Sequence, residues 1–310
     1  MEGKILKSSM LLLAVLLLCS TYGAADSSRL KLATTTSLHD SGLLDAIKPA
    51  FEKEYNVSLD IISVGSGQAI QYGQRGDVDV LLVHDKNAEL QFVQGGYGLE
   101  RRCVGYNYFE IVGPKNDPAG IKGMNATAAF KTIMEKGKAD PSKVMFVSRG
   151  DNSGTYSREK QIWKNAGLDY SQVNNSGPWY IDAGQGMGAT LMIANSKNAY
   201  TISDTSTFMA YSKKYTGNFM LVPLIEGGDD LLNVYTAIAV SPKNHPGVNC
   251  ELANKFINYL VSDEGQNLIA NFGKDLYGQA LFFAAKGNCT KIGCSAAECA
   301  VPTTASCGAA

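Results

Sequence analysis

The chain has 310 residues, of which 45% are hydrophobic and 18% charged, and its formal net charge is −1. This composition is typical of a folded globular protein long enough for two domains, and it excludes an intrinsically disordered chain. Because the charge is nearly balanced, we expect no nucleic-acid partner and no anionic membrane partner, since both need a broad basic surface.

Residues 1–25 form a predicted secretory signal peptide. Two lysines precede an apolar run over residues 10–18, and small residues up to Ala25 suit cleavage by a signal peptidase. The apolar run is too short to span a membrane. A lipoprotein attached through Cys19 is a second interpretation, which the bulky Leu18 before it disfavours. Cleavage would remove a net charge of +1 (two lysines and one glutamate), leave the mature chain at about −2, and place it outside the cytoplasm, in a periplasm or secreted.

The mature chain opens with a pattern that suits an anion. A short buried strand over residues 30–33 is followed by four consecutive hydroxyl residues, 34–37. Asp40 and Ser41 are good N-caps for a helix that we expect to begin near Leu43. Hydroxyl groups and a helix N-terminus together supply several hydrogen-bond donors around one point. The alternative is that the hydroxyls only cap the turn, and this stretch alone leaves both interpretations open.

Strands and helices alternate along the body of the chain. The run over residues 78–83 is apolar apart from Asp79, which is typical of a strand buried on both faces of a parallel sheet. Alternating βα units predict the α/β class, with open parallel sheets and ligand sites at the carboxyl ends of their strands. The predicted strands cover 57–64, 78–83, 104–112, 143–148, 199–203 and 234–240, and the predicted helices end at 74 or cover 87–94, 126–136, 154–166, 187–195, a stretch from 205, 251–260 and 264–272.

Nothing in the sequence marks a linker between independent modules, because no repeat and no low-complexity block precedes the tail. We therefore expect two lobes whose chain crossings lie near Gly113 and Val234. The predicted division is 26–113 with 235–286 for lobe 1, 114–234 for lobe 2, and 287–310 for a cysteine-rich tail.

A second polar cluster follows the strand predicted to end at residue 148. Arg149 can contact an oxyanion through two parallel N–H groups, and Asp151 can hold its guanidinium in place. Gly154 allows a close approach of the backbone, while Ser153 and Thr155 offer donors at a helix N-terminus. A surface arginine beside a capped helix is the alternative, but the combination of these residue types in this order favours a binding site.

The cysteines predict a stapled tail. Seven are present, and Cys19 would leave with the signal peptide. An even number in an exported chain indicates disulfides, with 15 possible pairings that remain open. A zinc site is the competing interpretation, but paired C-x-x-C units and a nearby histidine are missing. Sequons at Asn56, Asn125, Asn174 and Asn288 keep a eukaryotic secretory origin open. The six remaining cysteines are Cys103, Cys250, Cys289, Cys294, Cys299 and Cys307.

Taken together, the motifs resemble those of the substrate-binding proteins of tungstate ABC importers. The resemblance spans residues 30–283. It implies a two-lobed, periplasmic-binding-protein-like fold of type II, with mixed or parallel sheets and the ligand in a cleft between the lobes. The motifs are TTTS at 34–37 with DSGLL at 40–44, VGSGQA at 64–69, Asp77 to HD at 84–85, SRGD at 148–151 with SGT at 153–155, GMG at 186–188, Asn233 with Tyr235, IAV at 238–240 and EGQ at 264–266.

By resemblance, three loops surround a tetrahedral oxyanion, tungstate or molybdate, which the protein passes to an ABC permease. No cofactor, metal site or catalytic residue is implied, and we expect a monomer. The third loop is also similar to that of phosphate-binding proteins, so phosphate and sulfate are alternatives. The implied oxyanion-binding residues are Thr35, Thr36, Ser37, Ser66, Gly67, Arg149, Ser153, Gly154 and Thr155.

Two departures from the family pattern bear on partner and selectivity. Thr205 follows Asp204 where the family usually has Asp-Arg, and the cysteine-rich tail is foreign to the bacterial family. The tail therefore leaves open a secreted scavenger or sensor without a permease. Asp85 could accept the proton that phosphate retains, or it could cap the following helix. His84 beside it could be a ligand or a structural residue.

Catalysis is not expected. Only three histidines are present, and neither a metal-binding H-E-x-x-H motif nor a G-x-S-x-G nucleophile motif occurs. Ser37 or Ser66 could be imagined as a nucleophile with His39, but nothing in the sequence orients that histidine.

Overall fold

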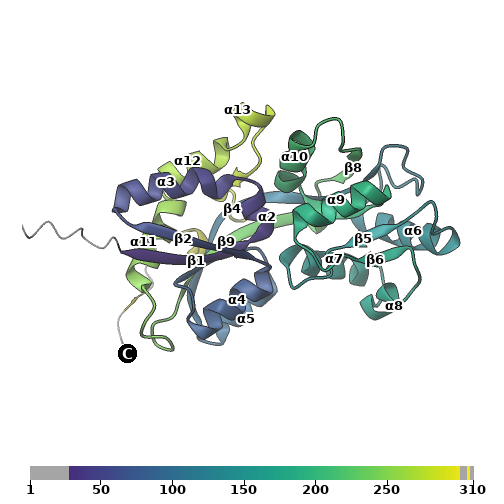
Figure 1. Ribbon diagram of the computed structural model, residues 1–310. Coiled ribbons are helices and arrows are strands. Elements are labelled where there is room, and N and C mark those ends of the chain that lie inside the picture. Colours follow the sequence, from purple (N-terminus) through teal and green to yellow (C-terminus); the bar gives the residue numbers. More distant parts are fainter. Residues whose placement is uncertain (1–27, 301–305, 308–310) are drawn as a thin grey trace, which may run out of the picture.

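The computed structural model describes residues 28–300 and 306–307, so the predicted signal peptide lies outside the described residues. Two lobes lie side by side, joined by long strands (Figure 1). Among the described helices, none combines the length and the apolar character that a bilayer crossing requires. The fold is mixed α/β, as the alternating pattern predicted.

Lobe 1 is built on a twisted sheet with helices on both faces. Its strand order is β10-β4-β9-β3-β1-β2. α3, α11 and α12 cover one face and α4 and α5 the other (Figure 1), and each layer has its own buried cluster of apolar side chains. The strands are β1 (Arg29–Thr35), β2 (Ser58–Val64), β3 (Val80–Val83), β4 (Gly98–Pro114), β9 (Leu232–Val240) and β10 (Phe283–Ala284), and the helices are α2 (Thr36–Asp40), α3 (Leu43–Tyr55), α4 (Ser66–Arg75), α5 (Lys86–Gln94), α11 (Cys250–Val261), α12 (Asp263–Asn271) and α13 (Lys274–Tyr277).

The sheet of lobe 1 is mixed rather than purely parallel. β1 runs parallel to β2 and β3, whereas β9 runs antiparallel to both β3 and β4. Asp79, the charged residue in the predicted apolar strand, is buried and accepts hydrogen bonds from the backbone N–H groups of Lys31 and Asn249, both at 2.7 Å. The carboxylate thus joins β1 to the segment before α11.

One continuous strand, β4, belongs to both lobes. Its first part, from Gly98 to Tyr108, pairs with β9, and its last part, from Phe109 to Pro114, pairs with β7 (Thr201–Asp204) and β8 (Leu221–Glu226). β9 begins at Leu232, opposite Tyr108. The lobes are therefore joined by paired backbone, and this junction fixes the strand ends on which the cleft is built.

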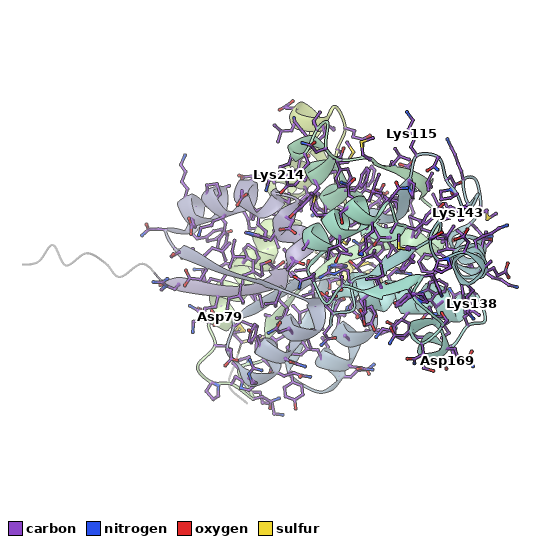
Figure 2. All side chains as sticks on the ribbon, turned by 45° about the vertical axis from the view of Figure 1, so that its right-hand side comes forward. Asp79, Lys115, Lys138, Lys143, Asp169 and Lys214 are labelled. Carbon is purple, nitrogen blue, oxygen red and sulfur yellow. A yellow bond between two sulfur atoms is a disulfide. The ribbon has the colours of Figure 1, made fainter. Side chains whose placement is uncertain are left out.

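Lobe 2 packs around an aromatic core that includes Phe130, Trp163 and Trp179. β5 and β6 run parallel, and Phe146 bridges to Tyr200 just before β7. Exposed Lys115, Lys138 and Lys143 lie at the outer edge of this lobe (Figure 2). Its other elements are α6 (Ala126–Ala139), β5 (Phe146–Ser148), α7 (Gly154–Asn165), α8 (Tyr170–Asn174), β6 (Tyr180–Asp182), α9 (Met187–Lys197), α10 (Thr205–Lys214) and the 3-10 turn η1 (Asp229–Leu231).

The hydroxyl stretch 34–37 differs from its prediction. Its first half ends β1 and its second half begins the short helix α2 rather than a turn, and the side chain of Thr35 caps this helix by accepting from Leu38 N at 3.3 Å. The N-cap of α3 is Gly42, with a left-handed φ of 81°, so the prediction of Asp40 or Ser41 at this position was wrong. Ser41 Oγ still accepts a hydrogen bond from Leu43 N at 3.2 Å.

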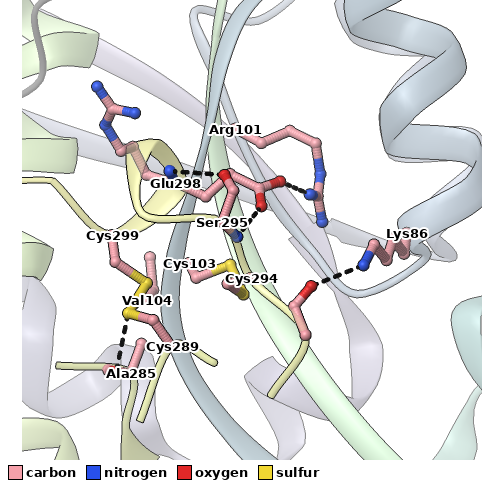
Figure 3. The surroundings of a disulfide bond; sticks show 12 residues. Lys86, Arg101, Cys103, Val104, Ala285, Cys289, Cys294, Ser295, Glu298 and Cys299 are labelled. Carbon is pink, nitrogen blue, oxygen red and sulfur yellow. Dashed lines mark hydrogen bonds and ion pairs between the residues drawn. A yellow bond between two sulfur atoms is a disulfide. The ribbon is translucent and has the colours of Figure 1, made fainter. Parts of the chain in front are cut away.

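All six expected cysteines form disulfides. The prediction of a disulfide-bonded tail is confirmed, and the cysteines do not form the competing zinc site. The pairs are Cys103–Cys294, Cys250–Cys307 and Cys289–Cys299. The first pair attaches the tail to β4, and charged groups reinforce it (Figure 3). Buried Arg101 pairs with both Glu89 and the tail residue Glu298, Arg102 donates to Ala297 O, and Lys86 Nζ donates to Gly293 O at 2.8 Å.

Candidate anion-binding site

The predicted binding residues lie where the two lobes face each other. Thr35 ends β1, Thr36 and Ser37 begin α2, Ser66 and Gly67 begin α4, and the third loop runs from β5 into α7. A hydrogen bond from Arg149 to Thr36 joins the third loop to the first, and one from Gly67 N to the backbone O of Asn152, at 2.9 Å, joins it to the second. Most of these side chains are buried: Thr35, Ser37, Ser66, Arg149, Ser153 and Thr155.

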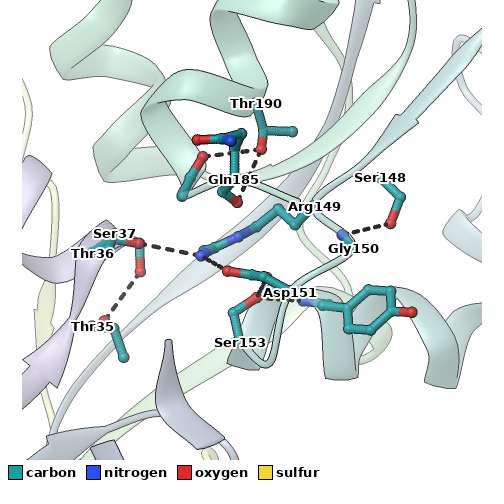
Figure 4. Close-up of polar contacts among 12 residues, drawn as sticks. Thr35, Thr36, Ser37, Ser148, Arg149, Gly150, Asp151, Ser153, Gln185 and Thr190 are labelled. Atoms are coloured by element: carbon teal, nitrogen blue, oxygen red, sulfur yellow. Dashed lines mark hydrogen bonds and ion pairs between the residues drawn. The ribbon is translucent and has the colours of Figure 1, made fainter. Parts of the chain in front are cut away.

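Arg149 is the central cation of this site (Figure 4). Its residue exposure is 1%, and Nη2 donates to Thr36 Oγ1 at 3.2 Å and to Asp151 Oδ2 at 2.5 Å. Asp151 is held in turn by Ser153 Oγ, at 2.5 Å. Nε and Nη1 of Arg149 are buried and have no hydrogen-bond partner within the described protein. Because an unpaired buried donor is costly, these atoms suit a ligand that brings oxygen acceptors.

Two further donors from opposite lobes share this condition. Ser66 Oγ, at the start of α4, and Thr155 Oγ1, at the start of α7, are buried without a partner in the described chain. Ser66 follows the N-cap Gly65, and Ser153 caps α7 by accepting from Tyr156 N at 3.1 Å. The positive ends of two helices therefore point their first-turn groups toward the same region, which favours a negative charge.

The first loop is held by hydrogen bonds on every side. Ser37 Oγ lies 3.2 Å from Thr35 Oγ1 and 3.2 Å from His84 Nε2. Thr207 Oγ1, from α10 in lobe 2, donates to the backbone O of Ser37 at 3.1 Å. This hydroxyl pair is fixed in place at the junction of β1, which ends at Thr35, and the short helix α2, which contains Ser37.

The acidic groups around the cleft are already engaged by protein donors. Asp85 caps α5 through Ala88 N at 3.2 Å, so its helix-cap interpretation is confirmed. Asp204 caps α10 by accepting from Thr207 N at 2.9 Å. Thr205, where the family pattern has arginine, donates to Tyr108 O at 3.0 Å and so ties α10 to β4. These carboxylates are therefore occupied, and the hydrogen-bond donors of the site are left for a ligand.

The buried carboxyl group of Glu159 stabilises the third loop through hydrogen bonds to the residues around its start. Glu159, on α7, accepts from Ser148 Oγ and Tyr180 Oη, both at 2.7 Å, and from Trp163 Nε1 at 3.1 Å. These partners carry no charge, and burial raises the pKa of Glu159 to about 7, although the three hydrogen bonds oppose the shift. Glu159 therefore fixes Ser148, the residue before Arg149.

This raised pKa predicts a pH-dependent stability. The ordinary pKa of 4.5 applies to the unfolded chain, so between about pH 4.5 and 7 the folded protein holds a proton that the unfolded chain has lost. The free energy of unfolding contributed by this group falls as the pH rises through that window. In Glu159→Gln we expect the stability difference between pH 5 and pH 7, from urea unfolding, to shrink by about 1–3 kcal/mol. An unchanged pH dependence would contradict this assignment.

Comparison with known proteins shows the family to which this chain belongs. A sequence model described as the PBP superfamily domain matches residues 21–264. The chain is 41% identical to the tungstate-binding protein TupA of Peptoclostridium acidaminophilum, over 81% of this chain and 84% of that one. It is 40% identical to TupA of Campylobacter jejuni, over 76% of this chain and 84% of that one. The chain belongs to the tungstate-binding protein family.

A solved structure of a tungstate-binding protein family member agrees with this assignment. The tungstate ABC transporter structure from Geobacter sulfurreducens is 46% identical in sequence and has a TM-score of 0.68. The match covers 79% of this chain and 98% of that chain. The two-lobed periplasmic-binding-protein fold predicted from the motifs is thereby confirmed.

Three contacts of this tungstate-binding protein family member were missed by sequence reasoning. Asn152 contacts Gly67 across the cleft, Thr207 contacts Ser37, and His84 contacts the hydroxyl of Ser37. Asn152 and Thr207 carry no local signal, because their roles depend on the closing of two lobes. His84 stands at the end of β3, a position that parallel-sheet rules associate with ligand sites.

Proposed function

We propose that the protein binds a bare tetrahedral oxyanion, tungstate or molybdate, by closing its two lobes over it. The observation that carries this proposal is a set of buried donors that have no partner among the described residues: Nε and Nη1 of Arg149, Ser66 Oγ and Thr155 Oγ1. They come from both lobes, and Thr35, Thr36, Ser37, Gly67, Ser153 and Gly154 complete the three loops around them. Such a set matches an anion that only accepts hydrogen bonds.

The donor-rich chemistry of the cleft favours tungstate and molybdate over phosphate. Near neutral pH the two metal oxyanions carry no proton, whereas phosphate retains one and gains from a free carboxylate acceptor. The nearby carboxylates of Asp85, Asp151 and Asp204 are occupied by a helix cap, by Arg149 and by α10 respectively. Sulfate is also unprotonated, so it differs from tungstate in its smaller size and in its shorter bonds from the central atom to oxygen.

The same proposal includes a site of action and a partner. Tungstate-binding relatives and the tungstate ABC transporter structure support delivery to an ABC permease from outside the cytoplasm. The relatives are named as binding proteins, which supports a binding role without catalysis. Monomeric action fits a cleft whose three loops all come from one chain.

Calorimetric titration tests the proposal directly. The mature protein is titrated with tungstate, molybdate, sulfate and phosphate at the same pH and ionic strength. We expect tungstate and molybdate to bind at least 100-fold more tightly than phosphate, because only phosphate would bury an unpaired O–H. Equal affinities for the four anions, or heat only with phosphate, would overturn the proposal.

Lobe closure makes its own prediction at Gly65. A Cβ atom on this residue would lie 2.5 Å from the backbone O of Asn152, which belongs to the opposite lobe. Since a backbone atom cannot turn aside, Gly65→Ala should disfavour the closed form and weaken tungstate binding by roughly tenfold. Gly247→Ala is the matched control, because a Cβ atom there meets nothing within 4 Å. Equal affinities of the two variants would show that closure does not need this contact.

A further inference from the structure

His84 occupies an unusual position beside the anion site. It follows β3 directly, its residue exposure is 7%, and its ring lies 4.9 Å from the ring of Tyr235 and 6.0 Å from that of Phe109, measured between centroids. The ring therefore sits in an aromatic setting between the sheet and the cleft. Burial is the main cause that lowers the pKa of His84 to about 4, so the imidazole is neutral at physiological pH.

A neutral imidazole carries one N–H, and the surroundings decide where it lies. Nε2 has an oxygen partner, Ser37 Oγ at 3.2 Å, whereas Nδ1 is buried and has no hydrogen-bond partner in the described chain. On the Nδ1 side the ring faces Gly154, where a Cβ atom would lie 2.8 Å from Nδ1. A proton on Nδ1 would be an unpaired buried donor, so the proton belongs on Nε2.

This tautomer determines what the hydroxyl of Ser37 can do. Its oxygen accepts from His84 Nε2, so its own proton cannot point toward the imidazole. Thr35 Oγ1 lies 3.2 Å from the same oxygen and already accepts from Leu38 N. Because Ser37 Oγ has two lone pairs, it can accept the Thr35 proton as well as the His84 proton. The Thr35 proton is thus used within the pair, and the Ser37 proton is left for an acceptor in the cleft. The backbone O of Ser37 is fixed separately by Thr207.

We propose that His84 is a positioning residue that donates from Nε2 to Ser37 Oγ and so orients the Ser37 hydroxyl to donate to the bound oxyanion. The inference rests on the proposed function and deepens it, because it assigns a role to a side chain that does not touch the ligand. With this role, the affinity for the oxyanion depends on where the side chain at position 84 places its N–H group, and not on a charge of that side chain.

Two conservative variants distinguish this role from simple packing. The amide nitrogen of glutamine can reach the place of Nε2, whereas that of asparagine reaches only the place of Nδ1. We expect His84→Gln to keep the tungstate dissociation constant within threefold of the wild type, and His84→Asn to raise it roughly tenfold. His39→Gln, at an exposed position on α2, is the control and should not change it. Equal losses in both His84 variants would overturn the assignment.

A double-mutant cycle locates the effect at Ser37. Ser37→Ala removes the hydroxyl that His84 orients, so adding His84→Asn to it should weaken tungstate binding by less than a further twofold. A further tenfold loss in the double variant would show that His84 acts elsewhere. Urea unfolding of each variant identifies those that fold, and only folded variants enter the cycle.

A ligand-free measurement separates this inference from the proposed function. In nitrogen-15 NMR spectra of the free protein, His84 should show a protonated Nε2 and a bare Nδ1. Failure of the wild type to bind any of the four oxyanions would overturn the proposed function and, with it, the role toward the ligand. A protonated Nδ1 with normal tungstate binding would overturn only the assignment of His84.

Discussion

Replacing Arg149 with alanine should weaken tungstate binding at least 100-fold, the largest effect on function that we expect from a single substitution. Arg149 is 1% exposed, and Nε and Nη1 of its guanidinium are buried without a hydrogen-bond partner among the described residues. A charge-assisted hydrogen bond in such a water-excluded place is strong, and truncating one partner of a buried charged pair costs about 2–5 kcal/mol. Calorimetric titration of Arg149→Ala against the wild type measures the change.

Arg149→Lys tests whether geometry matters beyond charge. Lysine keeps the positive charge but cannot offer two parallel N–H groups from one plane. We expect an affinity between those of the wild type and the alanine variant. The alanine substitution also leaves Asp151 without its cation, so Asp151→Asn in the Arg149→Ala background controls for that unpaired carboxylate. Tungstate affinity unchanged in Arg149→Ala would remove the basis of the site.

Loss of the Cys103–Cys294 disulfide should have the largest effect on stability. The bond joins residues separated by 191 positions, and a cross-link over a long loop removes much conformational entropy from the unfolded chain. We expect the double variant Cys103→Ala with Cys294→Ala to lower the free energy of unfolding by about 2–5 kcal/mol. Urea unfolding under non-reducing conditions gives this value.

The Cys289–Cys299 pair is the matched control for loop length. Its cysteines are only 10 positions apart, so the entropic model assigns it a stabilisation about 2.6 kcal/mol smaller than that of the long loop. Each pair has at least one cysteine in the same tail, so both double variants release a bond that holds this segment. Equal losses from the two double variants would mean that local packing of the tail, rather than loop closure, is the source of the stability.

The positions of helices and strands were predicted from the sequence better than the directions in which the strands run within the sheets. Apolar runs ended by glycine or hydroxyl residues placed β1, β2, β3 and the helices after them, because periodicity and caps are local properties. The reversed direction of β9 was missed, since it follows from the return of the chain out of lobe 2. β6, β8 and β10 were missed because they are short or contain proline, as β8 does at Pro223.

The candidate site shows the same limit. Its three loops were predicted because each has hydroxyls, glycine or arginine at the start of a helix. The tie between His84 and Ser37 spans 47 positions, and the pairing of six cysteines allows 15 arrangements, so neither could be obtained without the fold. Loops and caps can be predicted from neighbouring residues. Contacts between the two lobes depend on the topology of the fold, which the local sequence does not reveal.

The long disulfide also constrains how the protein is made. During synthesis Cys103 emerges well before Cys294, and Cys250 becomes available in between. The thiol of Cys103 must therefore either wait for the end of the chain or first react with Cys250 and then exchange. Formation of the native Cys103–Cys294 bond is thus a late event that needs nearly the whole polypeptide, and a disulfide isomerase should raise the yield of native protein.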